Sequence, residues 1–301
     1  MIELRDIAYV RSGVADLDKA VDFATRIVGL ELQQQTEPRV AHLRSDHRHH
    51  CLAFVEGRSG VLATGFEVTD DDALDRAETE LEASGYTVRR GDQNEARSRR
   101  VRNVIGFDDP FGNRIELVSQ QETITRPVRF ARTAGISEFG HVCLDAPDVH
   151  EAYQFWRTTF NAKVSDWIGD AACLMRIDPV HHKLAVFQGN EPGLCHMNFQ
   201  VESIDDLFRN WHFLLDNGVE IIQGPGRHPQ STAIFLYFLG PENFSYEYSF
   251  GVQRIEDEAA WQPRSFDPSE RGSIDMWLGP THRTSTQVQL RTDHQSGAQS
   301  R

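Results

Sequence analysis

The chain of 301 residues carries 31 lysines and arginines against 45 aspartates and glutamates, a formal net charge of −14 at pH 7. This acidic balance argues against nucleic acid as a partner, because phosphate binding needs basic patches. Hydrophobic residues make up 39% of the chain, enough for a globular core, and no apolar run approaches the roughly 20 residues that span a membrane.

Cysteine usage and the N-terminal residues predict a cytoplasmic protein. Cys51, Cys143, Cys173 and Cys195 form no C-x-x-C pair, and the first residues lack the basic start and apolar stretch of a signal peptide. Reduced thiols are therefore expected, with Cys195 interpreted as a small buried hydrophobe. A structural zinc site is not expected, because closed zinc sites usually need pairs of thiolates.

The first half of the chain alternates strand-like and helix-like patterns. A helix is predicted from Asp16, a good N-cap, to Gly29, with apolar residues at helical spacing. A second helix is predicted over residues 71–83, before Gly85. Strands are predicted at residues 5–10, 40–43, 51–55, 65–68, 101–107 and 114–118.

The same pattern then starts again. Segments 20–23, 49–53 and 110–116 match segments 152–155, 181–185 and 241–247, in the same order and with nearly constant offset. Such matches indicate an internal repeat. Each half reads as a strand, a helix and several strands, twice over. The predicted fold is therefore α+β, with two tandem modules that each contain paired βαβββ-like units.

Three positions of the second module suggest a metal site. Their counterparts in the first module are Tyr9 for His141, Ala63 or Thr64 for His196, and Glu116 for Glu247. Two histidines and one carboxylate that leave one face open suit non-haem Fe(II), with positions free for substrate and O2, and the same ligands suit Mn(II). The competing interpretation of each histidine is a hydrogen-bonded side chain in the core.

Residues 226–247 carry the most specific pattern of the chain. A loop histidine, His228, leads into an apolar run that ends in Tyr237, and a Gly-Pro turn then leads to a strand with Glu247. This stretch closely resembles the signature of the extradiol ring-cleaving dioxygenases of the vicinal oxygen chelate superfamily. The matching positions are Gly226, His228, Leu236, Tyr237, Pro241 and Glu247. Gly240 and Asn243 depart from the signature, both within the turn.

The resemblance covers about residues 2–251 and implies that each module forms a curved, mostly antiparallel sheet, with the metal site in the second module. It implies that His141, His196 and Glu247 are the iron ligands. It further implies that His182 is the acid–base histidine near dioxygen, and that His228 and Tyr237 stand beside the substrate hydroxyls. The implied activity is meta-cleavage of a substituted catechol with Fe(II), or Mn(II), and O2, in the catabolism of aromatic compounds by a homo-oligomer.

Five segments are expected along the chain. Residues 1–120 form an N-terminal module that lacks the metal-binding histidines, residues 121–137 a linker, and residues 138–251 the catalytic module. Residues 252–280, acidic and punctuated by proline, form a C-terminal extension. Residues 281–301, with few apolar side chains, are expected to be disordered.

Two other functions stay open from the sequence. A glyoxalase-like metal-dependent isomerase or lyase usually completes the site with a different ligand set and does not need His182, His228 and Tyr237. A non-catalytic small-molecule-binding protein of the same fold needs neither an open metal face nor an acid–base group. The histidine-rich run at residues 47–50 resembles a metal-binding tract, but we interpret it as solvated surface or loop.

Overall fold

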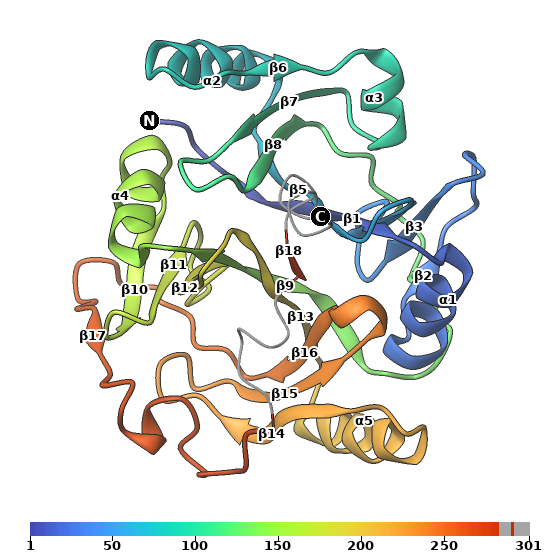
Figure 1. Ribbon diagram of the computed structural model, residues 1–301, viewed down its shortest axis with the longest axis vertical. Coiled ribbons are helices and arrows are strands. Elements are labelled where there is room, and N and C mark those ends of the chain that lie inside the picture. The colour runs from blue at the N-terminus through green and yellow to red at the C-terminus, as the bar shows by residue number, and fades with distance from the viewer. Residues whose placement is uncertain (283–289, 292–301) are drawn as a thin grey trace, which may run out of the picture.

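The computed structural model describes residues 1–282 and 290–291. Its first module consists of two βαβββ units that follow one another in the chain (Figure 1). The first unit contains β1 (Asp6–Val14), α1 (Leu17–Asp22) continued by the π-helical turn η1 (Phe23–Val28), β2 (Glu31–Leu32), β3 (Val40–Arg44) and β4 (Leu52–Glu56). The second contains β5 (Gly60–Val68), α2 (Asp71–Ala83), β6 (Arg89–Arg90), α3 (Gln93–Ser98), β7 (Asn103–Asp108) and β8 (Arg114–Ser119).

The second module repeats this order. Its first unit contains β9 (Ile136–Ala146), α4 (Val149–Thr159), β10 (Lys163–Ile168), β11 (Ala172–Arg176) and β12 (Leu184–Gln188). Its second unit contains β13 (Gly193–Val201), α5 (Ile204–Asp216), β14 (Ile221–Arg227), β15 (Ile234–Leu239), the 3-10 turn η2 (Pro241–Asn243) and β16 (Ser245–Phe250). The chain then adds β17 (Arg264–Ser265), the 3-10 turn η3 (Arg271–Ser273) and β18 (Leu290–Arg291).

Each module folds as one sheet in which two units meet along their first strands. The strand order is β2-β3-β4-β1-β5-β8-β7-β6 in the first sheet, and β14-β15-β16-β13-β9-β12-β11-β10-β17 in the second. The central pairs β1–β5 and β9–β13 are antiparallel, and each central strand also has a parallel neighbour from its own unit. The predicted α+β fold of two tandem modules with paired βαβββ units is confirmed.

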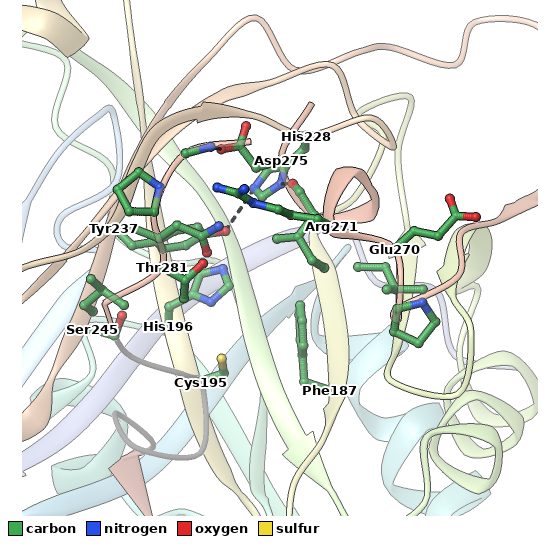
Figure 2. A pocket seen from close by; sticks show the side chains of 17 residues that line it. Phe187, Cys195, His196, His228, Tyr237, Ser245, Glu270, Arg271, Asp275 and Thr281 are labelled. Atoms are coloured by element: carbon green, nitrogen blue, oxygen red, sulfur yellow. Dashed lines mark hydrogen bonds between the residues drawn. The ribbon is translucent and has the colours of Figure 1, made fainter. Parts of the chain in front are cut away.

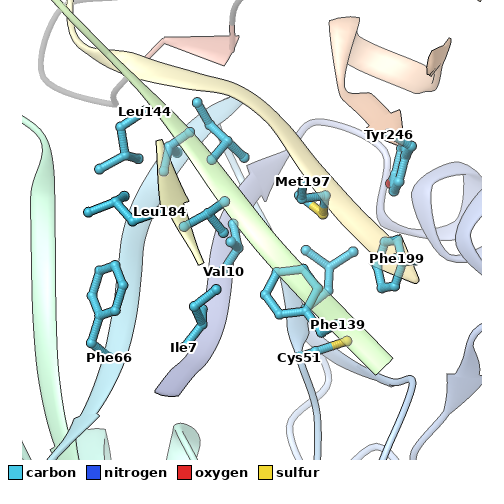
Figure 3. Packing of buried hydrophobic residues seen from close by; sticks show 14 of the residues in the cluster. Ile7, Val10, Cys51, Phe66, Phe139, Leu144, Leu184, Met197, Phe199 and Tyr246 are labelled. Atoms are coloured by element: carbon cyan, nitrogen blue, oxygen red, sulfur yellow. The ribbon is translucent and has the colours of Figure 1, made fainter. Parts of the chain in front are cut away.

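The main hydrophobic core lies between the two modules. Side chains alternate along β9, so Val142 and Leu144 point into this core while His141 and Cys143 point to the other face of the sheet. Figure 3 shows residues of both sheets packed together, among them Val10 from the first module and Leu184 from the second. Burial of each such side chain contributes about 1.5–3 kcal/mol. The core therefore fixes which face of each sheet is left to form a site.

The C-terminal extension packs against the second sheet. Strand β17 pairs with β10, so that Asp166 lies opposite Arg264, and the indole of Trp261 donates a hydrogen bond to the carbonyl of Ser165. Of the tail expected to be disordered, Thr281 forms a bridge with Gln223 and β18 pairs with β13. The expectation for residues 283–289 and 292–301 lies outside the described residues. The division of the chain into five segments stays a prediction.

Within the described part of the chain, no helix is long and apolar enough to cross a membrane.

Candidate metal centre and active site

Three adjacent strands bring the predicted metal ligands together. His141 lies on β9, His196 on the neighbouring β13, and Glu247 on β16, beyond β13. His196 pairs with Cys143, two residues after His141, and Glu247 pairs with Asn198, two residues after His196. Because side chains two residues apart on a strand share a face, all three predicted ligands point to the same side of the sheet.

The donor atoms of these side chains converge on one small volume. His141 Nε2 lies 3.0 Å from Glu247 Oε2 and 3.2 Å from His196 Nε2. His196 Nε2 lies 3.4 Å from the same carboxylate oxygen. Ligand atoms about 2.1 Å from one cation, in adjacent octahedral positions, are themselves about 3 Å apart. The observed spacing therefore fits a single divalent cation.

Glu247 has an unbalanced charge in this structure. Its side chain is 1% exposed, and neither carboxylate oxygen accepts a well-formed hydrogen bond from any residue that the structure describes. Burial acts to raise the pKa of Glu247, but His141, His196 and His228 together hold that pKa well below its usual value. Burial also lowers the pKa of His141. A carboxylate ion beside neutral imidazole is the protonation state in which these groups bind metal.

The first module shows what the same position looks like when its charge is balanced internally. The hydroxyl of Tyr9 donates to Glu116 Oε2 at 2.7 Å, and Arg99 donates to both carboxylate oxygens at 2.8 and 2.5 Å. A guanidinium thus stands next to the carboxylate of the first module. No arginine or lysine is paired with Glu247 among the described residues.

Strand register identifies the first-module counterpart of His196. Ala63 pairs with Arg11 in the first sheet, as His196 pairs with Cys143 in the second. Arg11 and Cys143 each lie two residues after the matched positions Tyr9 and His141. The counterpart is therefore Ala63, which carries no ligand atom.

His182 lies next to the predicted metal ligands and is not itself one of them. Its ring centroid is 4.3 Å from that of His141, and its Nδ1 is 3.1 Å from Nδ1 of His181. His181 Nε2 in turn lies 3.0 Å from Asp166 Oδ2, and both of these side chains are fully buried. Burial, and then His141 and His181, lowers the pKa of His182 well below its usual value, so the resting imidazole is neutral.

His228 and Tyr237 form a hydrogen-bonded pair beside the same site. The Nδ1–H of His228 donates to the carbonyl of Ile274 at 2.7 Å, which leaves Nε2 as an acceptor for the hydroxyl of Tyr237 at 3.1 Å. His228 Nε2 is also 3.8 Å from Glu247 Oε1. Burial, and then the charge of Glu247, raises the pKa of Tyr237 well above its usual value, so the phenol stays protonated.

A pocket of about 510 Å³ opens beside this pair (Figure 2). His196, His228 and Tyr237 line it, and Cys195 and Phe187 lie nearby in the same wall. The C-terminal extension and the residue after it supply much of the remaining lining, namely Pro268, Glu270, Arg271, Ile274, Asp275, Gly279, Pro280 and Thr281. The volume is in the range of sites that hold small organic ligands.

The sequence interpretation missed several residues of the site. Cys143 shares a face with His141 by simple strand alternation, and this spacing was available as a signal. Asp166 and Ile274 had no such signal, because β10 and the extension reach the site only through tertiary packing.

Residues 47–50 lie in the loop between β3 and β4, which agrees with the loop interpretation, but solvated surface is wrong for most of the run. Arg48 is 5%, His49 is 5% and His50 is 0% exposed. The ring of His50 stacks on Tyr9 with centroids 5.3 Å apart, at the position that corresponds to His182 beside His141. The cluster lines the buried face of the first module because it occupies the repeat position of the second module's histidine pair.

Residues 6–117 and 138–248 each match the Glyoxalase/Bleomycin resistance protein/Dioxygenase superfamily. The chain belongs to this superfamily. Among its curated relatives, the iron-dependent extradiol dioxygenase of Rhodococcus jostii is 23% identical over 300 residues, covering 92% of this chain and 97% of the relative. The 3-methylcatechol 2,3-dioxygenase of Pseudomonas putida is 28% identical over 274 residues, covering 84% of this chain and 92% of the relative.

Solved structures share this fold over nearly the whole chain. The halotolerant catechol dioxygenase BphC superposes with a TM-score of 0.86 at 24% identity, covering 96% of this chain and 99% of that one. The Mn(II)-bound glyoxalase from Novosphingobium aromaticivorans superposes with a TM-score of 0.84 at 24% identity, covering 98% and 99%. The superfamily fold of two tandem modules is thereby established for this chain.

Proposed function

We propose that this protein is an extradiol dioxygenase that opens the aromatic ring of a substituted catechol, using O2 and a divalent iron held by His141, His196 and Glu247. Full-length relatives carry the names iron-dependent extradiol dioxygenase, 3-methylcatechol 2,3-dioxygenase and biphenyl-2,3-diol 1,2-dioxygenase, and these names support the reaction class. The product of such a reaction is a muconic semialdehyde-type compound. Mn(II) is the alternative metal, because the same donors suit it.

The observation that carries the proposal is the contrast between Glu247 and Glu116. Both are buried glutamates at the same position of the repeat, but Glu116 is neutralised by Arg99, while Glu247 faces two imidazole nitrogens. An unpaired buried carboxylate is costly. A cation between Glu247 and the two histidines would remove that cost.

Charge favours a diol as the ligand of this centre. Two neutral imidazoles and one carboxylate leave a divalent cation with one net positive charge, which a deprotonated diol oxygen balances. When bound, Fe(II) would supply Lewis acidity toward the diol and redox chemistry toward dioxygen. All other roles fall to side chains of the chain itself.

Tyr237 and His228 are suited to receive the hydroxyls of the substrate. The Tyr237 hydroxyl donates to His228 Nε2, so its lone pairs remain free to accept a hydrogen bond from a diol hydroxyl in the pocket. The carbonyl of Ile274 holds the ring of His228 in the tautomer that this relay needs. The pair thus orients the diol and gives its proton a path away from the oxygen.

His182 is suited to act as the acid–base group. Its low pKa keeps the resting imidazole neutral, so it takes up a proton before it can donate one to an oxygen of the opening ring. Its ring contact with His141 supports a proton transfer beside the proposed metal ligands. The glyoxalase-like and the non-catalytic alternatives do not need an acid–base role for this histidine.

The test is anaerobic reconstitution with Fe(II), followed by addition of catechol, 3-methylcatechol, biphenyl-2,3-diol or 1,2-dihydroxynaphthalene in air. We expect about one iron per chain, oxygen uptake, and a yellow ring-fission product from at least one diol. His182→Ala is expected to keep its iron and lose about 100-fold or more in turnover. Bound iron with neither oxygen uptake nor product from any of the diols would overturn the proposal.

A matched pair of variants tests the ligand assignment. His141→Ala removes a proposed ligand, whereas Tyr9→Phe alters the same repeat position of the first module. We expect the first to lose iron and the second to keep it, as measured by metal analysis of the folded proteins. Equal iron content in both would contradict the assignment.

The remaining expectations concern the setting of the enzyme. We place it in the cytoplasm, where the four buried thiols, all of them free, would stay reduced. Assembly into a homo-oligomer stays a prediction of the family resemblance, and light scattering of the purified protein tests it.

A further inference from the structure

A thiol lies within the candidate metal centre. Cys143 Sγ is 3.1 Å from His196 Nε2, and the ligand atoms of His141, Cys143 and His196 all lie within 4.8 Å of one another. All three side chains are buried. Both oxygens of the adjacent Glu247 lack well-formed hydrogen bonds to described residues, which is a second indication that this point suits a cation.

We propose that this centre has a second ligand set, in which Cys143 joins His141, His196 and Glu247 to bind a soft divalent cation such as Zn²⁺ in a closed, four-coordinate site. The inference rests on the metal ligands of the proposed function but not on its ring-cleavage reaction. It goes beyond that function because it assigns a ligand role to a side chain that the Fe(II) set does not need.

The donor types and their spacing support two competing coordination modes. Thiolate selects Zn²⁺ and other soft cations, whereas two imidazoles and one carboxylate with an open face suit Fe(II). Tetrahedral bonds of about 2.1 Å to nitrogen or oxygen and about 2.3 Å to sulfur separate the donors by about 3.3–3.6 Å. His196 Nε2 lies 3.1 Å from Cys143 Sγ, 3.2 Å from His141 Nε2 and 3.4 Å from Glu247 Oε2, so these three contacts need to widen by only a few tenths of an ångström.

Binding in the second mode is a simple exchange. The S–H bond of Cys143 is replaced by an S–metal bond and the proton passes to solvent, while neither sulfur nor metal changes oxidation state. Four protein ligands then close the cation, so that no position stays free for a diol or dioxygen. Zn²⁺ already binds nitrogen and oxygen donors more tightly than Fe²⁺ does, and a thiolate ligand increases this difference in affinity. Zinc is therefore expected to hold the enzyme in an inactive form.

The first module offers no equivalent site. Arg11 stands where Cys143 stands in the second module, and the other ligand positions carry Tyr9 and Ala63. Arg99 already neutralises the carboxylate there. One thiolate-containing site per chain is therefore expected.

The experiment uses Co(II) alone as a spectroscopic probe of the metal-free, full-length protein, under anaerobic conditions. We expect wild-type protein to bind about one Co(II) and to show a thiolate-to-cobalt charge-transfer band. Cys143→Val and Cys143→Ser are expected to bind Co(II) without this band, and two variants guard against misfolding of one of them. Cys195→Val is the matched control, because Cys195 is a buried thiol of the same cluster outside the ligand group, and it is expected to keep the band.

Metal competition gives the second readout. Loss of an outer partner of a metal ligand already costs about 10–100-fold in affinity, so the Cys143 variants should lose at least about 100-fold in Zn²⁺ affinity. Their Fe(II) affinity should change much less, because His141, His196 and Glu247 remain.

Three results overturn the inference. Wild-type protein that binds Co(II) without a charge-transfer band refutes the thiolate ligand while the proposed iron site stands. Unchanged Zn²⁺ affinity in both Cys143 variants does the same. Failure of the wild-type protein to bind Co(II), Zn²⁺ or Fe(II) refutes the metal centre itself, and with it both the inference and the proposed function.

Discussion

Glu116→Gln tests whether the guanidinium of Arg99 takes the place of a metal ion in the first module. The variant removes the negative charge that Arg99 contacts through both carboxylate oxygens. The side chains of Glu116 and Arg99 are 5% and 12% exposed, so solvent screens the pair only weakly. The guanidinium would be left buried without its counter-charge.

The expected loss follows from this burial. Breaking a buried ion pair by removing one partner costs about 3–5 kcal/mol. The amide of Gln keeps one oxygen that can accept from Arg99 or Tyr9, so we expect the low end, a fall of about 3 kcal/mol in the free energy of unfolding. Asp108→Asn is the control, because the Asp108 side chain is 48% exposed where it pairs with Arg114, and such a pair contributes about 1 kcal/mol or less.

The assay is urea unfolding of metal-free protein at several pH values. Burial acts to raise the pKa of Glu116, but the bonds and charge of Arg99 outweigh it and hold the folded-state pKa below the usual value. A group with a lowered folded pKa contributes stability above its unfolded pKa, about 4.3, and loses that contribution as the pH falls through the folded value. The difference in the free energy of unfolding between wild type and Glu116→Gln should therefore reach its full size at pH 7 and shrink below about pH 4.

A double variant separates the ion pair from the shape of the site. Replacing buried ion pairs by apolar side chains of similar volume is often close to neutral, so Glu116→Leu with Arg99→Met should recover most of the loss. A fall of less than about 1 kcal/mol in Glu116→Gln would refute the reasoning, since breaking a buried pair costs several times more. A double variant as unstable as the single one would also refute it.

Three further predictions concern the second module. Asp166→Asn weakens the buried contact to His181 and should lower the free energy of unfolding by about 3 kcal/mol, while metal analysis still finds about one iron per chain. Tyr237→Phe removes the phenol that bonds His228 and should reduce kcat/KM about 100-fold, and a change within about threefold would contradict its role. Mn(II) at about 100 times its dissociation constant should raise the free energy of unfolding by about 2.7 kcal/mol, an effect that His141→Ala abolishes in the same urea assay.

The sequence predicts the repeat and the ligand positions because both depend on local spacing. Alternation along β9 and β13 decides which residues face the site, and the match between modules shows where His141 replaces Tyr9. Turn-linked β15 and β16 then bring Glu247 beside Tyr237, which the register confirms. These inferences need no knowledge of distant contacts.

Other features depend on tertiary contacts or weak local signals. Strand β10 mixes charged, polar and aromatic residues, so its sequence does not show which side chains are buried. Asp166 is buried because it contacts His181 and Arg264, which come from distant parts of the chain. Helix α3 has six residues, and its only buried residue is Ala96, so it shows no apolar periodicity from which it could be predicted. The capping box formed by Asp92 and Glu95 was the available signal.

The two modules differ in how the charge of a buried glutamate is balanced, and this difference predicts which module is catalytic. Each buries a glutamate on the strand next to its central pair, which by itself would cost several kcal/mol. In the first module Arg99 balances the charge of Glu116, so that carboxylate needs no bound cation. In the second module no lysine or arginine among the described residues pairs with Glu247, so we expect a bound cation to balance its charge. A cation bound at Glu247 could also bind the substrate through its open positions. We therefore expect catalysis in the second module and not in the first.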